Sequence, residues 1–313
     1  MRGWGSMWRK GRRCDGRRTT DLGRRMNDSV RSLLAGLIDY AGLFPPAALS
    51  MDDAVANYAT YRTGADAWAL GRFILPVSRL EEFEAHATGI ALGDPWRLSV
   101  LAQVSDADPI RAFNVRSAGR AVIDSLEAKA ETVDDVAALV PLASIGTVAV
   151  EIPVRDDPNA LVRAIGDRGF RAKIRTGGVT PAAFPAPADV ARFLAACARH
   201  GVAFKATAGL HHPLRGEYPL TYAADAARGT MFGYLNLFIA ALLVRRGMSE
   251  ADATALLEER DPLALRMDAT GVRWRAHTLD AGAVAGMRAE FALSFGSCSF
   301  REPIDDLTAL HLT

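Results

Sequence analysis

Lysine is scarce in this chain. Of its 37 basic residues only four are lysines, and the rest are arginines. The lysines are Lys10, Lys129, Lys173 and Lys205. Arginine keeps its proton in proteins, whereas a lysine that is desolvated or placed near another cation can lose its proton. A neutral amine attacks a carbonyl carbon to form a Schiff base. The lysines are therefore candidates for chemistry that arginine cannot perform.

Lys173 and Lys205 occupy similar places in the sequence. Each lies in a short apolar run, and each run is followed by a turn that contains glycine. One helical pattern separates them, as in a β–α–β crossover, and such crossovers place consecutive strands side by side. Two neighbouring ammonium groups disfavour each other's charge, so one is pushed towards the neutral form. We expect one of these two lysines to act as the neutral amine and the other to favour that state.

Three carboxylates end other apolar runs: Asp39, Asp124 and Glu151. An aspartate in such a place is often only a helix cap or a turn former. Five charged residues at one end of a fold are nevertheless costly to bury and hard to explain by structure alone. A carboxylate beside the amine can carry protons during imine chemistry. We expect one carboxylate of this set to relay protons, Asp39 to hold Lys205 or the substrate, and Glu151 to contact the substrate.

The elements that must position these residues alternate along the chain. Eight nearly continuous apolar runs are typical of strands buried on both faces. The predicted strands are Gly36–Asp39, Gly71–Leu75, Arg97–Gln103, Ala121–Asp124, Thr147–Ile152, Arg171–Arg175, Ala203–Thr207 and Ala292–Phe295. The predicted helices between them are Met51–Arg62, Leu80–Ala87, Thr132–Leu142, Pro158–Asp167 and Ala188–His200. This alternation predicts an α/β fold, a parallel (β/α)8 TIM barrel, whose catalytic residues lie at the C-terminal strand ends. An open doubly wound sheet is the alternative, although no GxGxxG or Walker loop follows the first strand.

The unit between the last two predicted strands is unusually long. It contains a strongly apolar helix at Met231–Val244, an acidic helix at Glu250–Glu259 and a possible hairpin around Met267–Leu279. We interpret residues of about 214–290 as an insertion that caps the mouth of the barrel or mediates a subunit contact, so a homo-oligomer is possible.

Charge divides the chain into two parts. Residues 1–25 hold nine basic and two acidic residues, net +7, which leaves 28 basic and 34 acidic residues, net −6, for residues 26–313. We expect 1–25 to be a disordered extension or the product of an upstream start codon, with a nucleic-acid or membrane arm as the alternative. Residues 26–313 are expected to form one barrel domain without a basic face for nucleic acid. The longest apolar stretch is too short to span a membrane, and three cysteines without a paired motif favour a cytoplasmic protein.

Seven stretches, in order along the chain, resemble the strands of deoxyribose-phosphate aldolase and related class I aldolases. They are LIDYAGLFPPAALSMDDAV, RFILPVSRLEEF, AVIDSLEAK, VAVEIPV, AKIRTGG, AFKATAGL and FGSCSF. The resemblance places Asp124 on the proton-relay aspartate, Lys173 on the Schiff-base lysine and Lys205 on the lysine that tunes it. It implies a carbon–carbon lyase that needs no metal or organic cofactor and acts on a small carbonyl or sugar-like substrate.

The resemblance also suggests which residues contact the substrate. Backbone and serines of the last stretch bind phosphate in that family, which implies a site for an anion or hydroxyl group. The expected substrate-binding residues are Glu151, Thr176, Gly177, Gly209, His211, His212, Ser297 and Ser299. The family's third-strand Phe-Pro-x-Gly motif is absent, and Ala208 precedes Gly209 where the family has two glycines. An alanine there limits the approach of backbone to an anion, so we expect a different substrate.

Two other functions remain open from the residues alone. His211 and His212 could serve a metal-assisted hydrolase or isomerase together with Glu151, although adjacent side chains diverge and rarely bind one ion. Cys298 has no obvious base beside it in the sequence, which favours an anion cradle or a buried thiol over a nucleophile. A non-catalytic binding barrel is the second alternative, and the retained lysines argue against it.

Overall fold

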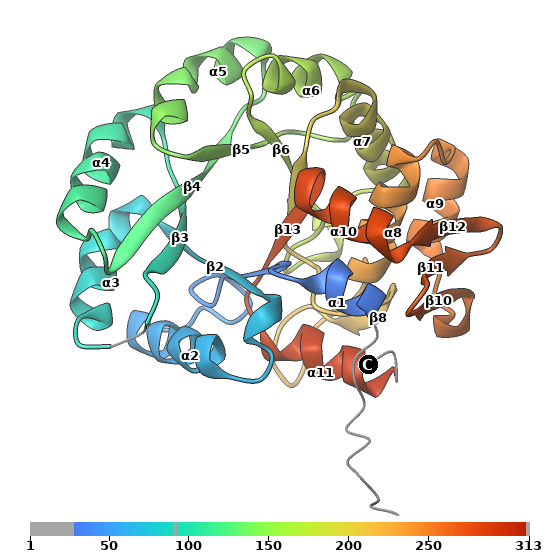
Figure 1. The fold of residues 1–313 in the computed structure, drawn as a ribbon, viewed down its shortest axis with the longest axis horizontal. Helices are drawn as coiled ribbons and strands as arrows, with labels where there is room; N and C mark the ends of the chain where they lie inside the picture. Colours follow the sequence, from blue (N-terminus) through green and yellow to red (C-terminus); the bar gives the residue numbers. More distant parts are fainter. Residues whose placement is uncertain (1–27, 91–92, 311–313) are drawn as a thin grey trace, which may run out of the picture.

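The computed structural model describes residues 28–90 and 93–310, and the basic segment 1–25 lies outside them. Eight parallel strands close into a barrel (Figure 1) in the order β1-β13-β7-β6-β5-β4-β3-β2. They are β1 (Ile38–Tyr40), β2 (Leu70–Pro76), β3 (Trp96–Leu101), β4 (Ala121–Lys129), β5 (Thr147–Glu151), β6 (Arg171–Arg175), β7 (Phe204–Thr207) and β13 (Ala292–Ser297). The predicted TIM barrel is thereby confirmed.

Helices follow the strands and form the outer layer of the barrel. They are α2 (Met51–Thr63), α3 (Leu80–Ala87), α4 (Ala107–Arg116), α5 (Val133–Ala138), α6 (Asn159–Gly166), α7 (Pro187–His200), α8 (Tyr234–Arg245) and α11 (Arg301–Ala309). The sequence interpretation omitted α4 and joined α5 to the separate 3₁₀ turn at Val140–Ser144. Apolar α8 is buried along almost its whole length, and Phe238 stacks on Phe204 of β7. It is therefore the barrel helix that follows β7.

The segment expected to cap the mouth does so only in part, and α9 (Glu250–Glu258) packs on the outer helices α7 and α8. The hairpin of β8 (Gly216–Pro219) and β9 (Arg228–Met231) supplies Leu220 and Met231 to a cavity at the mouth. The rest comprises α9, the sheet β10 (Leu265–Asp268), β11 (Gly271–Trp274) and β12 (His277–Asp280), and α10 (Ala281–Glu290). Helix α10 packs on α1 (Asp28–Leu34), which precedes β1, and therefore lies at the opposite end. Only the hairpin borders the mouth cavity.

Strand β4 is longer than its apolar pattern indicates. The prediction ended it at Asp124, whereas the strand continues to Lys129. Ser125 and Glu127 interrupt the apolar run because they point into a polar network inside the barrel rather than into its apolar core. As a consequence Asp124 lies before the middle of the strand, and Glu127 is the acidic residue nearer the mouth.

None of the helices in the described residues is long and apolar enough to cross a membrane.

Candidate active site

Lys173 and Lys205 lie opposite each other on neighbouring strands. β6 and β7 pair in parallel with Lys173 and Lys205 as Cα partners. Both side chains are buried, with only 4% of each residue exposed. The adjacency that the sequence spacing predicts is thus present in the structure.

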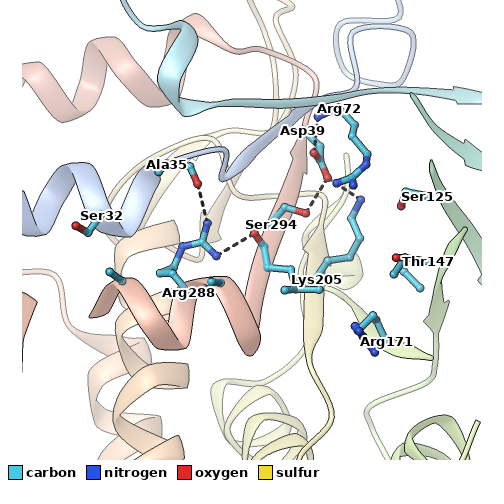
Figure 2. Close-up of a pocket in the computed structure, with 14 residues that line it drawn as sticks. Ser32, Ala35, Asp39, Arg72, Ser125, Thr147, Arg171, Lys205, Arg288 and Ser294 are labelled. Carbon is cyan, nitrogen blue, oxygen red and sulfur yellow. Dashed lines mark hydrogen bonds and ion pairs between the residues drawn. The ribbon is translucent and has the colours of Figure 1, made fainter. Parts of the chain in front are cut away.

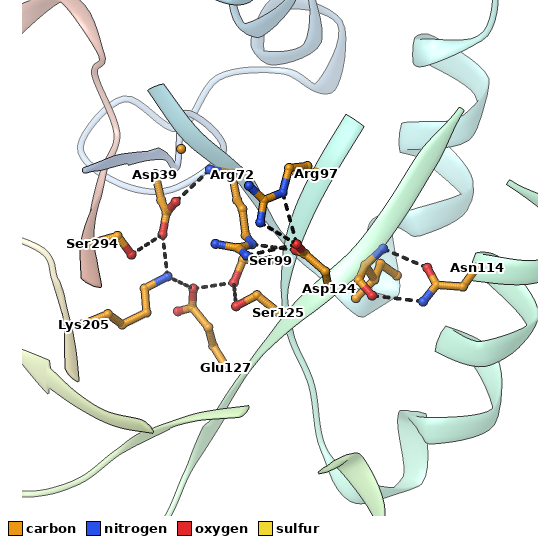
Figure 3. A network of polar contacts seen from close by, with 12 residues as sticks. Asp39, Arg72, Arg97, Ser99, Asn114, Asp124, Ser125, Glu127, Lys205 and Ser294 are labelled. Atoms are coloured by element: carbon orange, nitrogen blue, oxygen red, sulfur yellow. Dashed lines mark hydrogen bonds and ion pairs between the residues drawn. The ribbon is translucent and has the colours of Figure 1, made fainter. Parts of the chain in front are cut away.

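Glu127 joins the two lysines through one carboxylate. Its Oε2 lies 2.8 Å from Nζ of Lys173, and its Oε1 accepts a hydrogen bond of 2.6 Å from Nζ of Lys205. Ser99 donates a further hydrogen bond of 2.9 Å to Oε1 (Figure 3). Burial alone would raise the pKa of Glu127, but the charges and hydrogen bonds of the two lysines hold that pKa well below its usual range. Glu127 is therefore a carboxylate in direct reach of both amines.

Asp39 holds the other side of Lys205, as expected. Its Oδ2 accepts hydrogen bonds of 2.8 Å from Nζ of Lys205 and 2.8 Å from the hydroxyl of Ser294. The backbone N–H of Arg72 donates to Oδ1 at 2.7 Å. Burial would lower the pKa of Lys205, but Asp39 and Glu127 outweigh that effect and raise it. Lys205 is therefore held as an ammonium ion.

Glu151 contacts the lysine that borders the mouth. Its Oε2 lies 2.8 Å from Nζ of Lys173, and its Oε1 lies 3.1 Å from Nε of Arg175. Burial raises the pKa of Glu151, yet Lys173 and Arg175 together bring it below its ordinary value. Lys173 therefore has two carboxylates, Glu127 and Glu151, to which it could pass a proton.

Asp124 does not join this cluster, and the predicted relay role for it is not supported by its position. Its carboxylate pairs with Arg72 at 2.5 Å and with Arg97 at 2.7 Å (Figure 3). Burial raises its pKa, and these two guanidinium groups bring it below the ordinary value. The error follows from the strand boundary, because a β4 that ended at Asp124 would have placed this residue at the mouth.

The two lysines do not repel each other directly, contrary to the expectation from the sequence, because a carboxylate contacts both ammonium groups. The Glu127 carboxylate stands between their ammonium groups, and Asp39 adds a second negative charge beside Lys205. Opposite charges within hydrogen-bond distance favour the charged form of a lysine. The two ammonium groups are thus not left to repel each other unscreened, and any influence of Lys205 on Lys173 must pass through Glu127.

Two cavities, with volumes of about 350 and 930 Å³, meet at the C-terminal mouth of the barrel. Both are bordered by Leu101, Glu127, Lys173 and Arg175. The smaller is closed on its far side by the β1–α2 loop and by the β8–β9 hairpin. Lys173 therefore stands where molecules in either cavity could reach it.

A third cavity, of about 570 Å³, lies at the N-terminal floor. Residues from strand starts and from α1 and α10 line it, including Arg171, Arg288 and Ser294 (Figure 2). Lys205 and Asp39 border this cavity. The buried charged layer thus has Lys173 on the mouth side and Lys205 on the floor side, and the chemistry of a TIM barrel belongs to the mouth.

The glycine turns after β6 and β7 pack against each other. A Cβ on Gly177 would lie 2.9 Å from Cα of Gly209 and 2.5 Å from the ring of Phe184. The hydroxyl of Thr176 donates to the carbonyl of Ala208 at 2.6 Å. Thr176 and Gly177 thus fasten the two turns together, while Gly209 lines the mouth cavity.

Ser297, the last residue of β13, and Ser299, two residues later, do not form the expected anion site. Within residues 296–299 the mouth cavity is lined by Gly296 and Cys298. The hydroxyl of Ser299 accepts the N–H of Glu302 at the start of α11, and the hydroxyl of Ser297 lies 3.4 Å from the N–H of Ser299. The alternation of side chains along an extended chain therefore turns Cys298, rather than the serines, towards the cavity.

The adjacent histidines point to different partners. Nδ1 of His211 lies 2.8 Å from Glu302, and His211 lines the mouth cavity. His212 stacks on Tyr218 with ring centroids 3.5 Å apart, and its Nδ1 lies 2.5 Å from Asp306. Within the described residues no group of three or more His, Cys, Asp or Glu is arranged to hold a metal ion. The arrangement gives no support to a shared metal site with Glu151.

Comparisons with protein-family models, with curated proteins and with solved structures found no match. The assignment of function therefore rests on the geometry of the site.

Glu127 is the central residue that the sequence interpretation missed. Its signal was present, because AVIDSLEAK places it two residues beyond Ser125 on the same face of a strand. The buried partners Ser99 and Ser294, which lie at apolar strand positions, carry no comparable signal in the sequence.

Proposed function

We propose that this protein is a carbon–carbon lyase of the class I aldolase type, in which Lys173 forms an imine with a small carbonyl substrate. The observation that carries the proposal is the position of Lys173, a buried lysine that borders both mouth cavities and contacts two carboxylates. The likeness of its motifs to deoxyribose-phosphate aldolase supports a distant relationship.

The amine of Lys173 must lose a proton before it can attack a carbonyl. Glu127 and Glu151 each have an oxygen 2.8 Å from Nζ, so either can accept that proton. Attack gives a carbinolamine, and loss of water then gives the imine. Both steps need proton transfers to and from oxygen, for which a positioned carboxylate is suited.

Glu127 is the better candidate for the proton relay. It touches Lys173 through one oxygen and Lys205 through the other, so a proton taken from Lys173 can be balanced by the Lys205 charge. Asp39 and Ser294 hold Lys205 in place. In this proposal Glu127 takes the role that the sequence gave to Asp124, and Lys205 stabilises the relay carboxylate.

The two cavities fit a reaction that makes or breaks a carbon–carbon bond. Such a reaction requires room for two fragments on either side of the imine carbon, and Lys173 borders both spaces. Arg175 lies at the shared edge with its side chain 48% exposed. Its guanidinium group can attract a hydroxyl or carboxylate group of the substrate. The substrate need not carry a phosphate.

Borohydride trapping tests the proposal. The full chain is incubated with a panel of small aldehydes and ketones, reduced, and examined by intact mass. We expect a single adduct with at least one carbonyl compound in the wild-type protein. Lys129 is exposed at the end of β4 and borders the larger cavity, so Lys129→Arg is the matched control and should trap normally. Lys173→Arg should lose the adduct, and wild-type trapping by Lys173→Arg would refute the proposal.

A further inference from the structure

Cys298 lines the mouth cavity that Lys173 also borders, and it has polar neighbours that are distant in the sequence. It follows β13 directly and is 5% exposed. Nε2 of His211 lies 3.9 Å from Sγ, within the range of a hydrogen bond to sulfur. His211 comes from the turn after β7, far away in sequence, so only the closure of the barrel brings the two together.

The imidazole of His211 is oriented by a carboxylate. Its Nδ1 lies 2.8 Å from Oε2 of Glu302 on α11, so Nδ1 carries the hydrogen and Nε2 is directed at sulfur. The hydroxyl of Tyr222 lies 3.1 Å from the same Oε2 and 3.7 Å from Sγ. Cys298, His211 and Glu302 thus form the nucleophile, base and orienting group of a triad.

The charges around His211 favour the imidazolium form. Burial lowers the pKa of His211, but its contacts with Cys298 and Glu302 more than reverse this and raise the pKa to about 9. The pKa of Glu302 falls below its ordinary value despite burial, chiefly because of His211. Tyr40 of β1 and Tyr222 of the hairpin are the other titratable groups facing the sulfur, and burial raises the pKa of each, so both stay neutral.

We propose that Cys298 is a thiolate paired with the imidazolium of His211, and that it forms a second covalent site in the mouth cavity for the carbonyl carbon of a small aldehyde. The thiolate attacks this carbon, an S–C bond forms, and the C=O π pair moves to oxygen. The proton on Nε2 of His211 passes to that oxygen, which gives a neutral hemithioacetal and a neutral imidazole. Reversal of the same steps releases the aldehyde, so no further reactant is consumed.

The choice of an aldehyde rests on the proposed function, because the cavity that holds Cys298 also holds Lys173. The ion pair itself does not depend on that function. An aldehyde held on Cys298 would be stored beside the lysine until the imine partner is in place. The two sites are therefore separable by experiment.

Alkylation of the full chain by iodoacetamide, followed by peptide mapping, measures the reactivity of Cys298. An ordinary thiol is only a few per cent thiolate at neutral pH, so His211→Gln should slow alkylation of Cys298 roughly 10- to 30-fold. His212→Gln is the matched control, because His212 also has a carboxylate partner but stacks on Tyr218. It should leave the rate unchanged. Cys197, fully buried in α7, serves as the internal unreactive thiol.

The pH dependence of this rate separates a thiolate pair from an ordinary exposed thiol. We expect the wild-type alkylation rate to change little between neutral and mildly acid pH, and the rate of His211→Gln to fall with pH as the rate of free cysteine does. Wild-type alkylation with an ordinary thiol profile, or equal slowing by His211→Gln and His212→Gln, would overturn the ion pair. Melting temperatures of the variants exclude a general loss of fold.

Nuclear magnetic resonance of propanal labelled at its carbonyl carbon tests the aldehyde. The Lys173→Arg protein is used so that no imine can form there. A protein-bound tetrahedral carbon signal, separate from that of free propanal hydrate, supports the hemithioacetal if it disappears in Lys173→Arg/Cys298→Ser. Its absence from Lys173→Arg would overturn the aldehyde assignment. Failure of borohydride trapping on Lys173 with fast alkylation of Cys298 would instead count against the lyase proposal and for the thiolate.

Discussion

Lys173 and Lys205 face each other across neighbouring strands, with one carboxylate, that of Glu127, between their ammonium groups. The pair therefore does not act by direct repulsion. A buried carboxylate with a lysine on each oxygen can accept a proton from one while the other remains charged, which is the property that a proton relay needs. Four strands, β1, β4, β6 and β7, contribute to this one contact system through Asp39, Glu127 and the two lysines.

Glu127→Gln should abolish the relay while preserving the shape of the side chain. Loss of a positioned acid–base group lowers rates by about 10²- to 10⁴-fold, so imine formation and exchange of the α-protons of a trapped carbonyl compound should slow by that order. Asp124→Asn is the matched control from the same strand, because Asp124 pairs with Arg72 and Arg97. If Asp124→Asn slows imine formation as much as Glu127→Gln, the assignment of the relay is wrong.

Lys205→Met should destabilise the protein strongly, since it leaves Asp39 and Glu127 without their shared ammonium. Removal of one partner from a buried ion pair costs about 3–5 kcal/mol. Asp39→Asn in the Lys205→Met background should recover part of this loss, with a coupling free energy of roughly 0.5–3 kcal/mol. Urea unfolding of the two single variants and the double variant measures the coupling. Strict additivity would show that the contact contributes nothing.

The stability of the fold should fall at acid pH because of Glu127 and Glu151. Their pKa values in the folded protein lie below the ordinary 4.5, so the unfolded chain binds protons more readily. The stability they contribute is present above pH 4.5 or so and is lost as pH falls through the lowered values, by about 1.4 kcal/mol for each unit of pKa difference. Lys205, with its pKa raised above 10.5, contributes below that pH and loses its contribution as pH rises.

Melting temperatures across the acid range check this dependence. Glu127→Gln should have a lower melting temperature at neutral pH and a flatter decline towards acid pH than the wild type. Glu82→Gln is the control, because Glu82 pairs with Arg79 near the surface, where its side chain is 41% exposed, and such pairs contribute less than buried ones. An unchanged acid slope in Glu127→Gln would contradict the buried ion-pair network.

Gly177→Ala should destabilise the mouth by about 1–3 kcal/mol, the usual effect of overpacking. The added Cβ would meet the backbone of Gly209 and the ring of Phe184 at distances that real side chains do not adopt. Gly286→Ala makes the same chemical change in the exposed middle of α10, where a Cβ meets nothing within 4 Å. It should stabilise by about 0.5–1 kcal/mol through helix propensity. The same sign for both variants in urea unfolding would contradict the proposed contact between the two turns.

The sequence predicted the barrel and the lysine pair because both depend on local patterns. Continuous apolar runs marked the strands, and one helix between Lys173 and Lys205 set their adjacency. The scarcity of lysine marked the few lysines as candidates for imine chemistry, which residue spacing alone does not indicate. The extent of β4 could not be predicted in this way, since Ser125 and Glu127 are polar residues inside the barrel and break the apolar run.

The side chains that contact one another at the barrel mouth could not be predicted from the sequence either. Cys298 and His211 are brought together only when β13 packs between β7 and β1, and Glu302 reaches His211 from the last helix. Ser297 and Ser299 were chosen for their type, but the position of each along an extended segment directs its side chain away from the cavity that Cys298 lines. Side-chain direction at a strand end depends on register, which a short motif does not reveal.

Peptide mapping of the borohydride adduct tests the central claim most directly, because it locates the imine on one lysine. After reduction with the best carbonyl compound of the panel, the protein is digested and the modified residue is sequenced by mass spectrometry. The account predicts modification of Lys173, with Lys205 unmodified, since Lys173 borders the mouth cavities and Lys205 is held by Asp39 and Glu127. An adduct on Lys205, Lys129 or Lys10 in place of Lys173 would contradict it.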